Sequence, residues 1–325
     1  MSEAMKTEKT HGENPKGRFT SDPMKAGKGQ GKMIQDIAPK KFHIEYQNKQ
    51  PAGYETALVY NGPLTLLRMD EDGVLTYPKT KDFDGTDAEF IYLFRIDDEE
   101  YYLVVIEPEE IPEILLEEGF RFEKDWTFRS AKPGDRAFAG VTGKQLSLWY
   151  SSHRYCGGCG TELVADEKER MMKCPKCGRT FYPVICPGVI VAVVHDGKLL
   201  MSKYAGREYK RFALIAGFNE SGESIEDTVH REVMEETGLA VRSLHFYKSQ
   251  PWPFSDTLLM GFFCELDGDK DQITLEEDEL SMAGWYAPAE VPEDREHISL
   301  TSEMMTVFRE NGGDFQRILD VLERK

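Results

Sequence analysis

Three acidic residues, Glu232, Glu235 and Glu236, stand at spacing i, i+3, i+4 in the segment from Gly217 to Leu239. On a helix of 3.6 residues per turn they fall within an arc of roughly 100°. Three like charges so close repel one another unless their pKa values rise or a cation lies among them. Hard divalent cations prefer oxygen ligands. The spacing therefore predicts a site for magnesium or a similar ion.

The elements that must position these acids can be read from the flanking residues. Ser224 followed three residues later by Asp227 is a capping-box-like helix start, and Gly238 stands where a helix would end in a left-handed cap. The pattern predicts a helix over about 226–237. Arg231 is placed to steady one carboxylate, and Glu223, in the preceding loop, to orient the others.

The same segment resembles the Nudix box, GX5EX7REUXEEXGU with U an aliphatic residue. It agrees at every specified position, and these are Gly217, Glu223, Arg231, Glu232, Val233, Glu235, Glu236, Gly238 and Leu239. A solvated charged helix is the alternative, but nine matches within 23 residues argue against chance. The resemblance implies metal-dependent cleavage of a diphosphate.

Four cysteines form a second cluster, Cys156, Cys159, Cys174 and Cys177, in two CxxC pairs separated by fourteen residues. This is the spacing of a four-cysteine zinc ribbon. Because all four ligands come from protein, one Zn²⁺ held there would be structural. The alternatives are a pair of disulfides and a zinc ribbon that binds nucleic acid. The chain shows no secretory signal, and the intervening segment lacks a basic stripe.

A third cluster, SQPWPFSDT, runs from Ser249 to Thr257. Its prolines favour a rigid, extended backbone that holds the Trp252 ring and the Gln250 amide in place. A turn that packs its aromatic residues into the core is the alternative. A zinc ribbon, a Nudix box and SQPWPF in this order resemble the NADH pyrophosphatase subfamily. Ser255 stands where that subfamily usually has proline, and Thr257 where it has serine.

The resemblance implies roles for individual residues. Glu232 and Glu236 would bind two or three Mg²⁺ or Mn²⁺ ions together with the main-chain carbonyl of Ala216 and with Glu279, while Glu235 would be a ligand or the general base. The rings of Phe218 and Tyr182 would stack on the substrate, with Tyr182 serving the other subunit of a homodimer. The remaining expected substrate contacts are Gln250, Pro251, Trp252, Pro253, Phe254, Ser255, Asp256, Thr257 and Thr301.

Charge and hydropathy narrow the class of protein. The formal net charge of −18 argues against broad electrostatic binding of RNA or DNA, and against unaided binding of an anionic dinucleotide. Bound cations would reverse the local sign at the site. No run approaches the roughly 18 apolar residues of a membrane helix. We expect a cytoplasmic enzyme with no membrane partner.

Four segments are expected along the chain. Residues 1–40 are polar and predict a disordered tail, 41–150 a strand-rich α+β domain, 151–183 the zinc ribbon and 184–325 the Nudix domain. The resemblance implies that the domain over 41–150 serves dimerisation and cleft shaping. We expect helices over Glu109–Phe120, Asp135–Trp149 and Leu300–Glu310. Hairpins are expected at FRIDDEEYYLVV and VIVAVVHDGKLLMSKY, with further strands at LIAGF, LLMGFFCEL and Ala283–Val291. The fold class is then α+β or α/β, with a Nudix α/β/α sandwich built on a mixed sheet.

The resemblance to the NADH pyrophosphatase subfamily implies hydrolysis of the diphosphate of NAD(H) to NMN(H) and AMP. The same site could remove 5′ NAD caps from RNA, which is the first alternative. A Nudix diphosphatase that prefers ADP-ribose or dinucleoside polyphosphates is the second, supported by Ser255. A non-enzymatic nucleotide sensor is the third, and the intact box argues against it.

Overall fold

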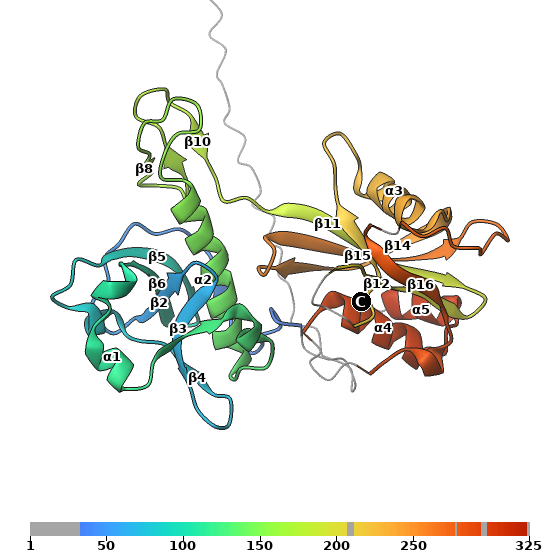
Figure 1. The fold of residues 1–325 in the computed structure, drawn as a ribbon, viewed down its shortest axis with the longest axis horizontal. Coiled ribbons are helices and arrows are strands. Elements are labelled where there is room, and N and C mark those ends of the chain that lie inside the picture. The colour runs from blue at the N-terminus through green and yellow to red at the C-terminus, as the bar shows by residue number, and fades with distance from the viewer. Residues whose placement is uncertain (1–32, 207–210, 277, 294–297, 324–325) are drawn as a thin grey trace, which may run out of the picture.

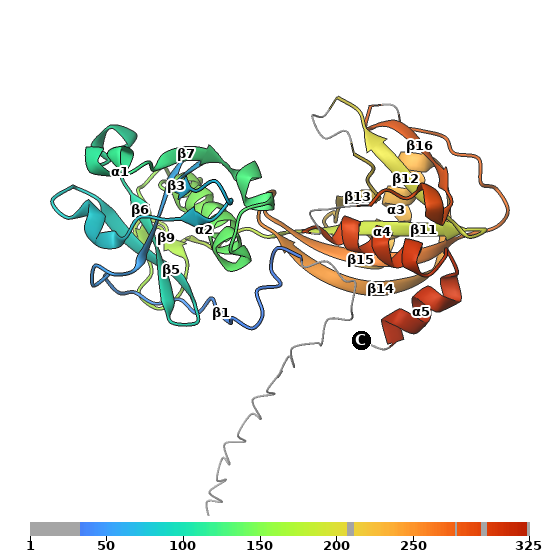
Figure 2. The ribbon, with the colours of Figure 1, turned by 90° about the horizontal axis from the view of Figure 1, so that it is seen from below.

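The computed structural model describes residues 33–206, 211–276, 278–293 and 298–323. Figures 1 and 2 show two lobes, an N-terminal domain and a C-terminal domain, with a small module at the end of a long helix between them in sequence. None of the helices in the described residues is long and apolar enough to cross a membrane.

The N-terminal domain is built on a sheet with strand order β1-β5-β6-β2-β3-β4, and β7 pairs with β3. The strands are β1 (Phe42–His43), β2 (Thr56–Asn61), β3 (Leu64–Met69), β4 (Leu75–Thr76), β5 (Glu89–Ile96), β6 (Glu99–Val105) and β7 (Arg121–Lys124). The expected hairpin at β5 and β6 is confirmed, and Asp97 takes a left-handed φ of 50° at its turn. Helix α2 (Gly134–Ser152) packs onto this sheet through Ala137 and Phe138.

One expected helix is shorter than predicted. Over Glu109–Phe120 the chain forms a 3-10 turn, η2 (Pro108–Glu110), and then a short helix, α1 (Glu113–Glu117). Pro112 lies between the two. Because proline disfavours the helical conformation of the residue before it, the two pieces do not form one continuous helix. The expected helix over Asp135–Trp149 is confirmed as α2, which is longer. Another 3-10 turn, η3 (Asp125–Arg129), precedes it.

The module after α2 has three short strands in the order β10-β9-β8. They are β8 (Val164–Ala165), β9 (Met172–Lys173) and β10 (Thr180–Phe181). Its core contains only Cys156, Leu163 and Cys174, with two partly buried neighbours. Because so few apolar contacts do not hold a domain together, this module needs a bound ion for stability.

The C-terminal domain has a six-stranded sheet in the order β14-β15-β11-β12-β16, with β13 paired to β11. The sheet is mixed because β11 and β15 are parallel and the other pairs antiparallel. The strands are β11 (Cys186–His195), β12 (Lys198–Tyr204), β13 (Ile215–Phe218), β14 (Val241–Trp252), β15 (Thr257–Leu266) and β16 (Leu280–Tyr286). The expected hairpin of β11 and β12 turns at Asp196 and Gly197, both with positive φ.

Helices cover both faces of this sheet, as expected for an α/β/α sandwich. Helix α3 (Ile225–Thr237) buries Val229 and Val233 in one cluster, and α4 (Leu300–Glu310) buries Leu300 and Phe308 in the other. The expected helix over Leu300–Glu310 is confirmed. A last helix, α5 (Phe315–Glu323), was not predicted. The expected strand at Ala283–Val291 ends earlier, at Tyr286, and a 3-10 turn, η4 (Pro288–Glu290), follows.

The expected disordered tail over residues 1–40 needs a correction at its end. Residues 1–32 lie outside the described residues, but Met33 and Ile34 are buried. Met33 packs in the core under α4, whereas Ile34 packs in the core of the N-terminal domain. Two apolar side chains in a polar segment gave too weak a pattern to predict this burial. We call residues 33–40 the N-terminal strap.

Candidate active site

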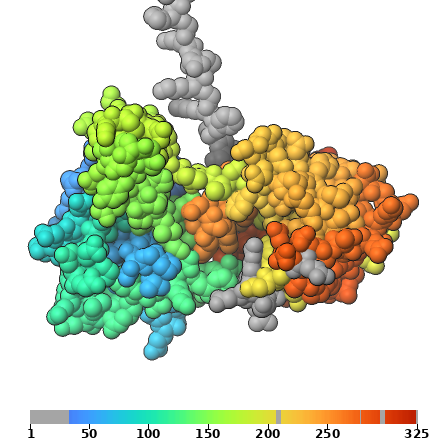
Figure 3. All heavy atoms as spheres, turned by 45° about the horizontal axis from the view of Figure 1, so that its top comes forward, coloured from blue at the N-terminus to red at the C-terminus, as the bar shows by residue number. Residues whose placement is uncertain are grey.

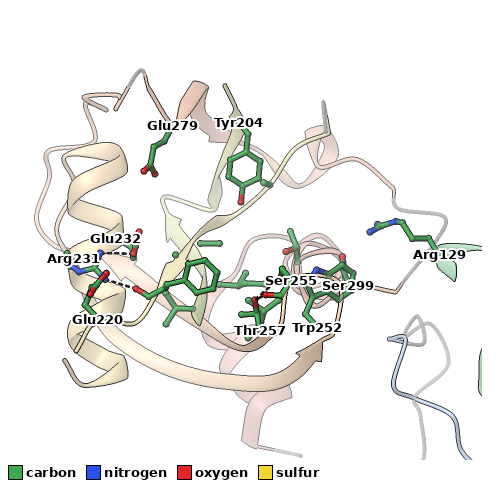
Figure 4. Close-up of a pocket in the computed structure, with 18 residues that line it drawn as sticks. Arg129, Tyr204, Glu220, Arg231, Glu232, Trp252, Ser255, Thr257, Glu279 and Ser299 are labelled. Carbon is green, nitrogen blue, oxygen red and sulfur yellow. Dashed lines mark hydrogen bonds and ion pairs between the residues drawn. The ribbon is translucent and has the colours of Figure 1, made fainter. Parts of the chain in front are cut away.

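A cavity of about 550 Å³ opens beside β13 and the middle of α3. Figure 3 shows the surface hollowed beside the orange residues of the hairpin between β14 and β15. Figure 4 shows Arg231 and Glu232 at one end of the cavity and Arg129 toward the other. The lining residues are Arg129, Val189, Ile190, Tyr204, Ala213, Ala216, Gly217, Phe218, Glu220, Arg231, Glu232, Trp252, Ser255, Thr257, Leu259, Glu279, Ser299 and Thr301.

Helix α3 begins and ends as predicted. The Ser224 hydroxyl accepts a hydrogen bond from the Asp227 main-chain N–H at 3.1 Å, and the Asp227 carboxylate accepts from the Ser224 N–H at 3.3 Å. Gly238 closes the helix in the left-handed region with φ 70°. Residues close to the helix in sequence therefore fix both of its ends, and with them the positions of its acidic residues along α3.

Gly217 allows the Glu232 carboxylate to lie directly on the backbone of β13. A Cβ at position 217 would come within 2.0 to 2.1 Å of the Glu232 carboxyl atoms. Any other residue would push Glu232 away from this position. The glycine that begins the motif is thus required by close approach, because its own φ lies outside the left-handed region.

Arg231 connects the loop before α3 to the acids on it. Its guanidinium donates to Glu223 through Nε at 2.6 Å and Nη2 at 2.9 Å, and also to the Phe218 carbonyl at 2.8 Å. Nη1 donates to Glu232 at 2.7 Å and to Glu235 at 2.9 Å. This confirms the expectation that Arg231 steadies a carboxylate. Only the fork of arginine reaches so many acceptors at once.

Two of these carboxyl groups have shifted pKa values, in opposite directions. The hydrogen bond from Arg231 lowers the pKa of Glu223 to about 2. Burial raises the pKa of Glu232, although Arg231 opposes that effect. Glu223 therefore stays ionised as the fixed partner of Arg231, whereas a charge on Glu232 carries a desolvation cost that a nearby cation would offset.

The donor set fits a divalent cation of the kind predicted. Glu232 is 8% exposed and lines the cavity together with Ala216 and Glu279, whereas Glu236, one turn further along α3, is 2% exposed and does not line it. The Glu235 side chain is 59% exposed and paired with Arg231, so it is the least enclosed of the three helical acids. Oxygen donors of this type suit Mg²⁺ or Mn²⁺. Among the described residues, however, no three acids bring carboxylate oxygens within 4.8 Å of one another.

The four cysteines do gather in this way, with all Sγ atoms within 4.8 Å. Cys156 and Cys177 Sγ lie 3.6 Å apart, and Cys159 and Cys174 Sγ lie 3.5 Å apart. A tetrahedral Zn–S₄ centre with bonds of about 2.3 Å requires sulfur separations of about 3.8 Å. The set therefore fits zinc, and the alternative of two disulfides is not found, because all six cysteines of the chain are free.

The hairpin from Ser249 to Thr257 contributes three residues to the cavity, Trp252, Ser255 and Thr257. Pro251, Pro253, Phe254 and Asp256, which were also expected to contact substrate, do not line it. Phe254 supports Trp252 instead, since their ring centroids lie 4.7 Å apart. Ser255 and Thr257 hydroxyl oxygens are 2.9 Å apart, so the hydroxyl at 257 also stabilises the turn.

Gln250 is the clearest correction. It is fully buried, and its amide oxygen accepts from the Leu300 N–H at 2.6 Å. Its amide nitrogen donates to the Ile298 carbonyl at 2.9 Å and to Gln35 Oε1 at 3.0 Å. The amide is therefore used within the protein and does not reach substrate. The sequence could not reveal partners 48 to 215 residues away.

The two expected stacking rings differ in position. Phe218 lines the cavity and is 53% exposed, as a ring that meets a ligand should be. Tyr182 is equally exposed but lies outside this cavity, and its hydroxyl donates to Glu169 at 2.8 Å. Thr301, the weakest sequence-based assignment, does line the cavity.

Eight lining residues were not predicted. Four are aliphatic, namely Val189, Ile190, Ala213 and Leu259, and the other four are Arg129, Tyr204, Glu220 and Ser299. Arg129 belongs to the N-terminal domain, and its guanidinium carbon lies 4.5 Å from the Trp126 ring centroid and 5.7 Å from that of Trp252. No local pattern marks it. Ser299 had a signal, since it precedes the predicted helix and caps α4 by accepting from the Ser302 N–H at 3.3 Å.

Two family models match the chain. Residues 185–305 match the NUDIX domain, and residues 151–182 match the NADH pyrophosphatase zinc ribbon domain. The first range covers the C-terminal domain up to the first half of α4, and the second covers the cysteine module. Each range contains one of the two sequence motifs.

Curated relatives are similar to part of the chain. The chain is 39% identical over 150 residues to the NAD-capped RNA hydrolase NudC of Escherichia coli (strain SMS-3-5 / SECEC), and 41% identical over 151 residues to that of Shigella flexneri. Each match covers 46% of this chain and 58% of the relative. A solved NUDIX hydrolase from Nitrosomonas europaea is 21% identical with a TM-score of 0.43, covering 49% of this chain and 91% of that one.

Proposed function

We propose that this chain, which carries a Nudix domain behind a zinc ribbon of the NADH pyrophosphatase type, hydrolyses the diphosphate of NAD(H) to NMN(H) and AMP. The observation that carries the proposal is one cavity in which Glu232 lies against the backbone at Gly217 and which Phe218 and Trp252 also line. The cavity thus offers oxygen donors for diphosphate-bound cations and aromatic faces for planar heterocycles.

The acidic end would hold the reacting diphosphate. Glu232, Glu236, Glu279 and the Ala216 carbonyl would hold two or three Mg²⁺ or Mn²⁺ ions. Such ions supply charge neutralisation for the diphosphate and lower the pKa of attacking water. Arg231 and Glu223 keep Glu232 and Glu235 in place, and Glu235, which is the most exposed, is available as ligand or general base. Because the protein is strongly negative, the cations would be needed to bind the anionic substrate as well as for the chemical step.

The aromatic end would hold the bases. Phe218 stacks on one heterocycle, and stacking on an aromatic side chain contributes about 1 to 3 kcal/mol per base. Tyr182 is exposed on the zinc ribbon away from the cavity of its own chain, so its contribution would require a partner copy in a homodimer. The homodimer and a cytoplasmic location are part of the same proposal.

A second candidate is removal of NAD caps from RNA by the same residues. The name shared by the curated relatives, NAD-capped RNA hydrolase, favours it. A preference for ADP-ribose or dinucleoside polyphosphates is the remaining alternative, because Ser255 lies in the cavity wall at the position where the NADH pyrophosphatase motif has proline.

Hydrolysis of NADH in ¹⁸O-labelled water, followed by mass spectrometry of the products, tests the proposal. We expect NMNH and AMP, with the label in the phosphate that water attacked. ADP-ribose, diadenosine polyphosphates and NAD-capped RNA are assayed in parallel with Mg²⁺ and Mn²⁺. Equal rates on all dinucleotides would remove the NAD(H) assignment. A Glu236→Gln variant that hydrolysed as fast as the wild type would remove the proposed metal site.

A further inference from the structure

The N-terminal strap makes contacts with both domains at the point where they meet behind the cavity. Met33 is 4% exposed in the C-terminal core, and the next residue, Ile34, is 6% exposed in the N-terminal core. The Ile34 N–H donates to the Ile298 carbonyl at 3.2 Å. The strap is therefore fixed at both residues before Gln35, and this fixes where the Gln35 side chain can reach.

Gln35 accepts a hydrogen bond from the buried amide of Gln250. That amide also binds the two main-chain groups that flank Ser299, namely the Ile298 carbonyl and the Leu300 N–H. One side chain thus joins three segments that are far apart in sequence: the strap, the end of β14 and the start of α4. Because Gln250 is fully buried, losing any partner would leave a buried polar group unsatisfied.

Two of these three segments, the end of β14 and the start of α4, contribute residues to the cavity. Trp252 follows two residues later on β14, and Ser299 and Thr301 stand on either side of Leu300. A shift of the amide would move both parts of this wall together. The wall faces the end of the cavity away from Arg231 and Glu232, so it contacts the part of a substrate that does not react (Figure 4).

We propose that Gln35 is a positioning residue for substrate binding, acting through Gln250 to set Trp252 and the start of α4 in the wall of the cavity. The inference rests on the proposed function, which supplies the substrate. The strap would then act on substrate affinity. Contacts with the non-reacting part of a substrate are equally strong in the ground state and the transition state, so their loss changes KM and leaves kcat unaltered.

Gln35→Ala tests this role, with Gln47→Ala as the control at an exposed glutamine. We expect KM for NADH to rise roughly three- to tenfold in Gln35→Ala with kcat unchanged, as for loss of one hydrogen bond at a buried group. Gln35→Glu keeps an acceptor oxygen and should stay closer to the wild type. In a Gln250→Ala background, Gln35→Ala should add nothing. A fall in kcat with constant KM would overturn the proposal.

A second measurement needs no substrate. Amide hydrogen exchange in Gln35→Ala should speed up at Leu300–Glu303 and at the end of β14, and should not change in Gln47→Ala. Unchanged exchange at both segments would overturn the positioning role even if NADH is hydrolysed. Faster exchange in a protein that cleaves no dinucleotide would support the positioning role and reject the proposed function instead.

Discussion

At the scale of single residues, the proposed chemistry depends on two contacts of Glu232. Gly217 leaves the space that the Glu232 carboxylate occupies, and Arg231 holds that carboxylate together with Glu223 and Glu235. The motif predicted both residues, but the reason for the glycine, a close approach of side chain to backbone, is visible only in the structure.

Gly217→Ala should abolish most hydrolysis while leaving the fold intact. The new Cβ would come about 2 Å from the Glu232 carboxyl atoms, so this proposed metal ligand must move. Gly134→Ala is the control, because a Cβ there meets nothing within 4 Å. Activity and thermal unfolding are measured for both variants. Full activity in Gly217→Ala would contradict the proposed role of Glu232.

Arg231→Lys should weaken metal binding about 10- to 100-fold, as loss of the groups that orient metal ligands usually does. Lysine keeps the charge but not the fork that binds Glu223, Glu232 and Glu235 together. Mn²⁺ titration with activity as the readout measures the change. Unaltered Mn²⁺ dependence would show that the arginine acts by charge alone.

At the scale of elements, the structure shows which segments fix themselves and which need help. Helix α3 is capped by its own sequence at both ends, so it was predicted almost to the residue. The cysteine module has a core of three residues, so its fold depends on the four sulfur atoms.

Zinc removal should unfold this module before the rest of the chain. We expect one zinc per chain by elemental analysis, and after chelation a loss of structure confined to residues 151–183, because the free energy of binding is the main source of stability in so small a unit. Hydrogen exchange locates the change. Retained protection of that segment without zinc would show that the module is stable by itself.

The turn before β2 should lose stability in acid. Burial alone would raise the pKa of Glu55, but main-chain N–H groups of Ala52 and Gly53 and the Thr80 hydroxyl lower it to about 2. A folded-state pKa below the ordinary value of 4.5 stabilises the fold above pH 4.5, and that stabilisation is lost as pH falls toward 2.

Urea unfolding of the wild type and Glu55→Gln between pH 7 and 3 measures this effect. The wild type should be the more stable at neutral pH, and the difference should shrink as pH falls below 4.5. The exposed Glu71→Gln serves as control. A difference that is constant with pH would show that the carboxylate charge is not what stabilises the turn.

At the scale of the whole molecule, the cavity is a product of both domains. The C-terminal domain supplies the acidic end, and the N-terminal domain supplies Arg129 and, through the strap, the anchor of Gln250. Because the net charge is −18, an anionic substrate of the proposed kind would need cations at the site in order to bind.

Ile34→Ala should lower the free energy of unfolding by about 2 to 5 kcal/mol, the usual cost of truncating a buried isoleucine. The control is Ile44→Ala, because Ile44 is 46% exposed whereas Ile34 is 6% exposed. The two variants are compared by urea unfolding. Equal stability would show that the strap is held only through its hydrogen bonds.

By itself, the sequence determined what depends on neighbours along the chain. The capped helix with its acids, the paired cysteines and the hairpins turning at Asp97 and Asp196 are local patterns, and each is found in the structure. Only the tertiary structure decided which side chains share the cavity. Gln250 turned inward because Gln35 and Leu300, 215 and 50 residues away, satisfy its amide, and Arg129 entered the cavity from another domain. Contacts at such separations are set by packing and by the pairing of buried polar groups, and neither leaves a repeat in the sequence.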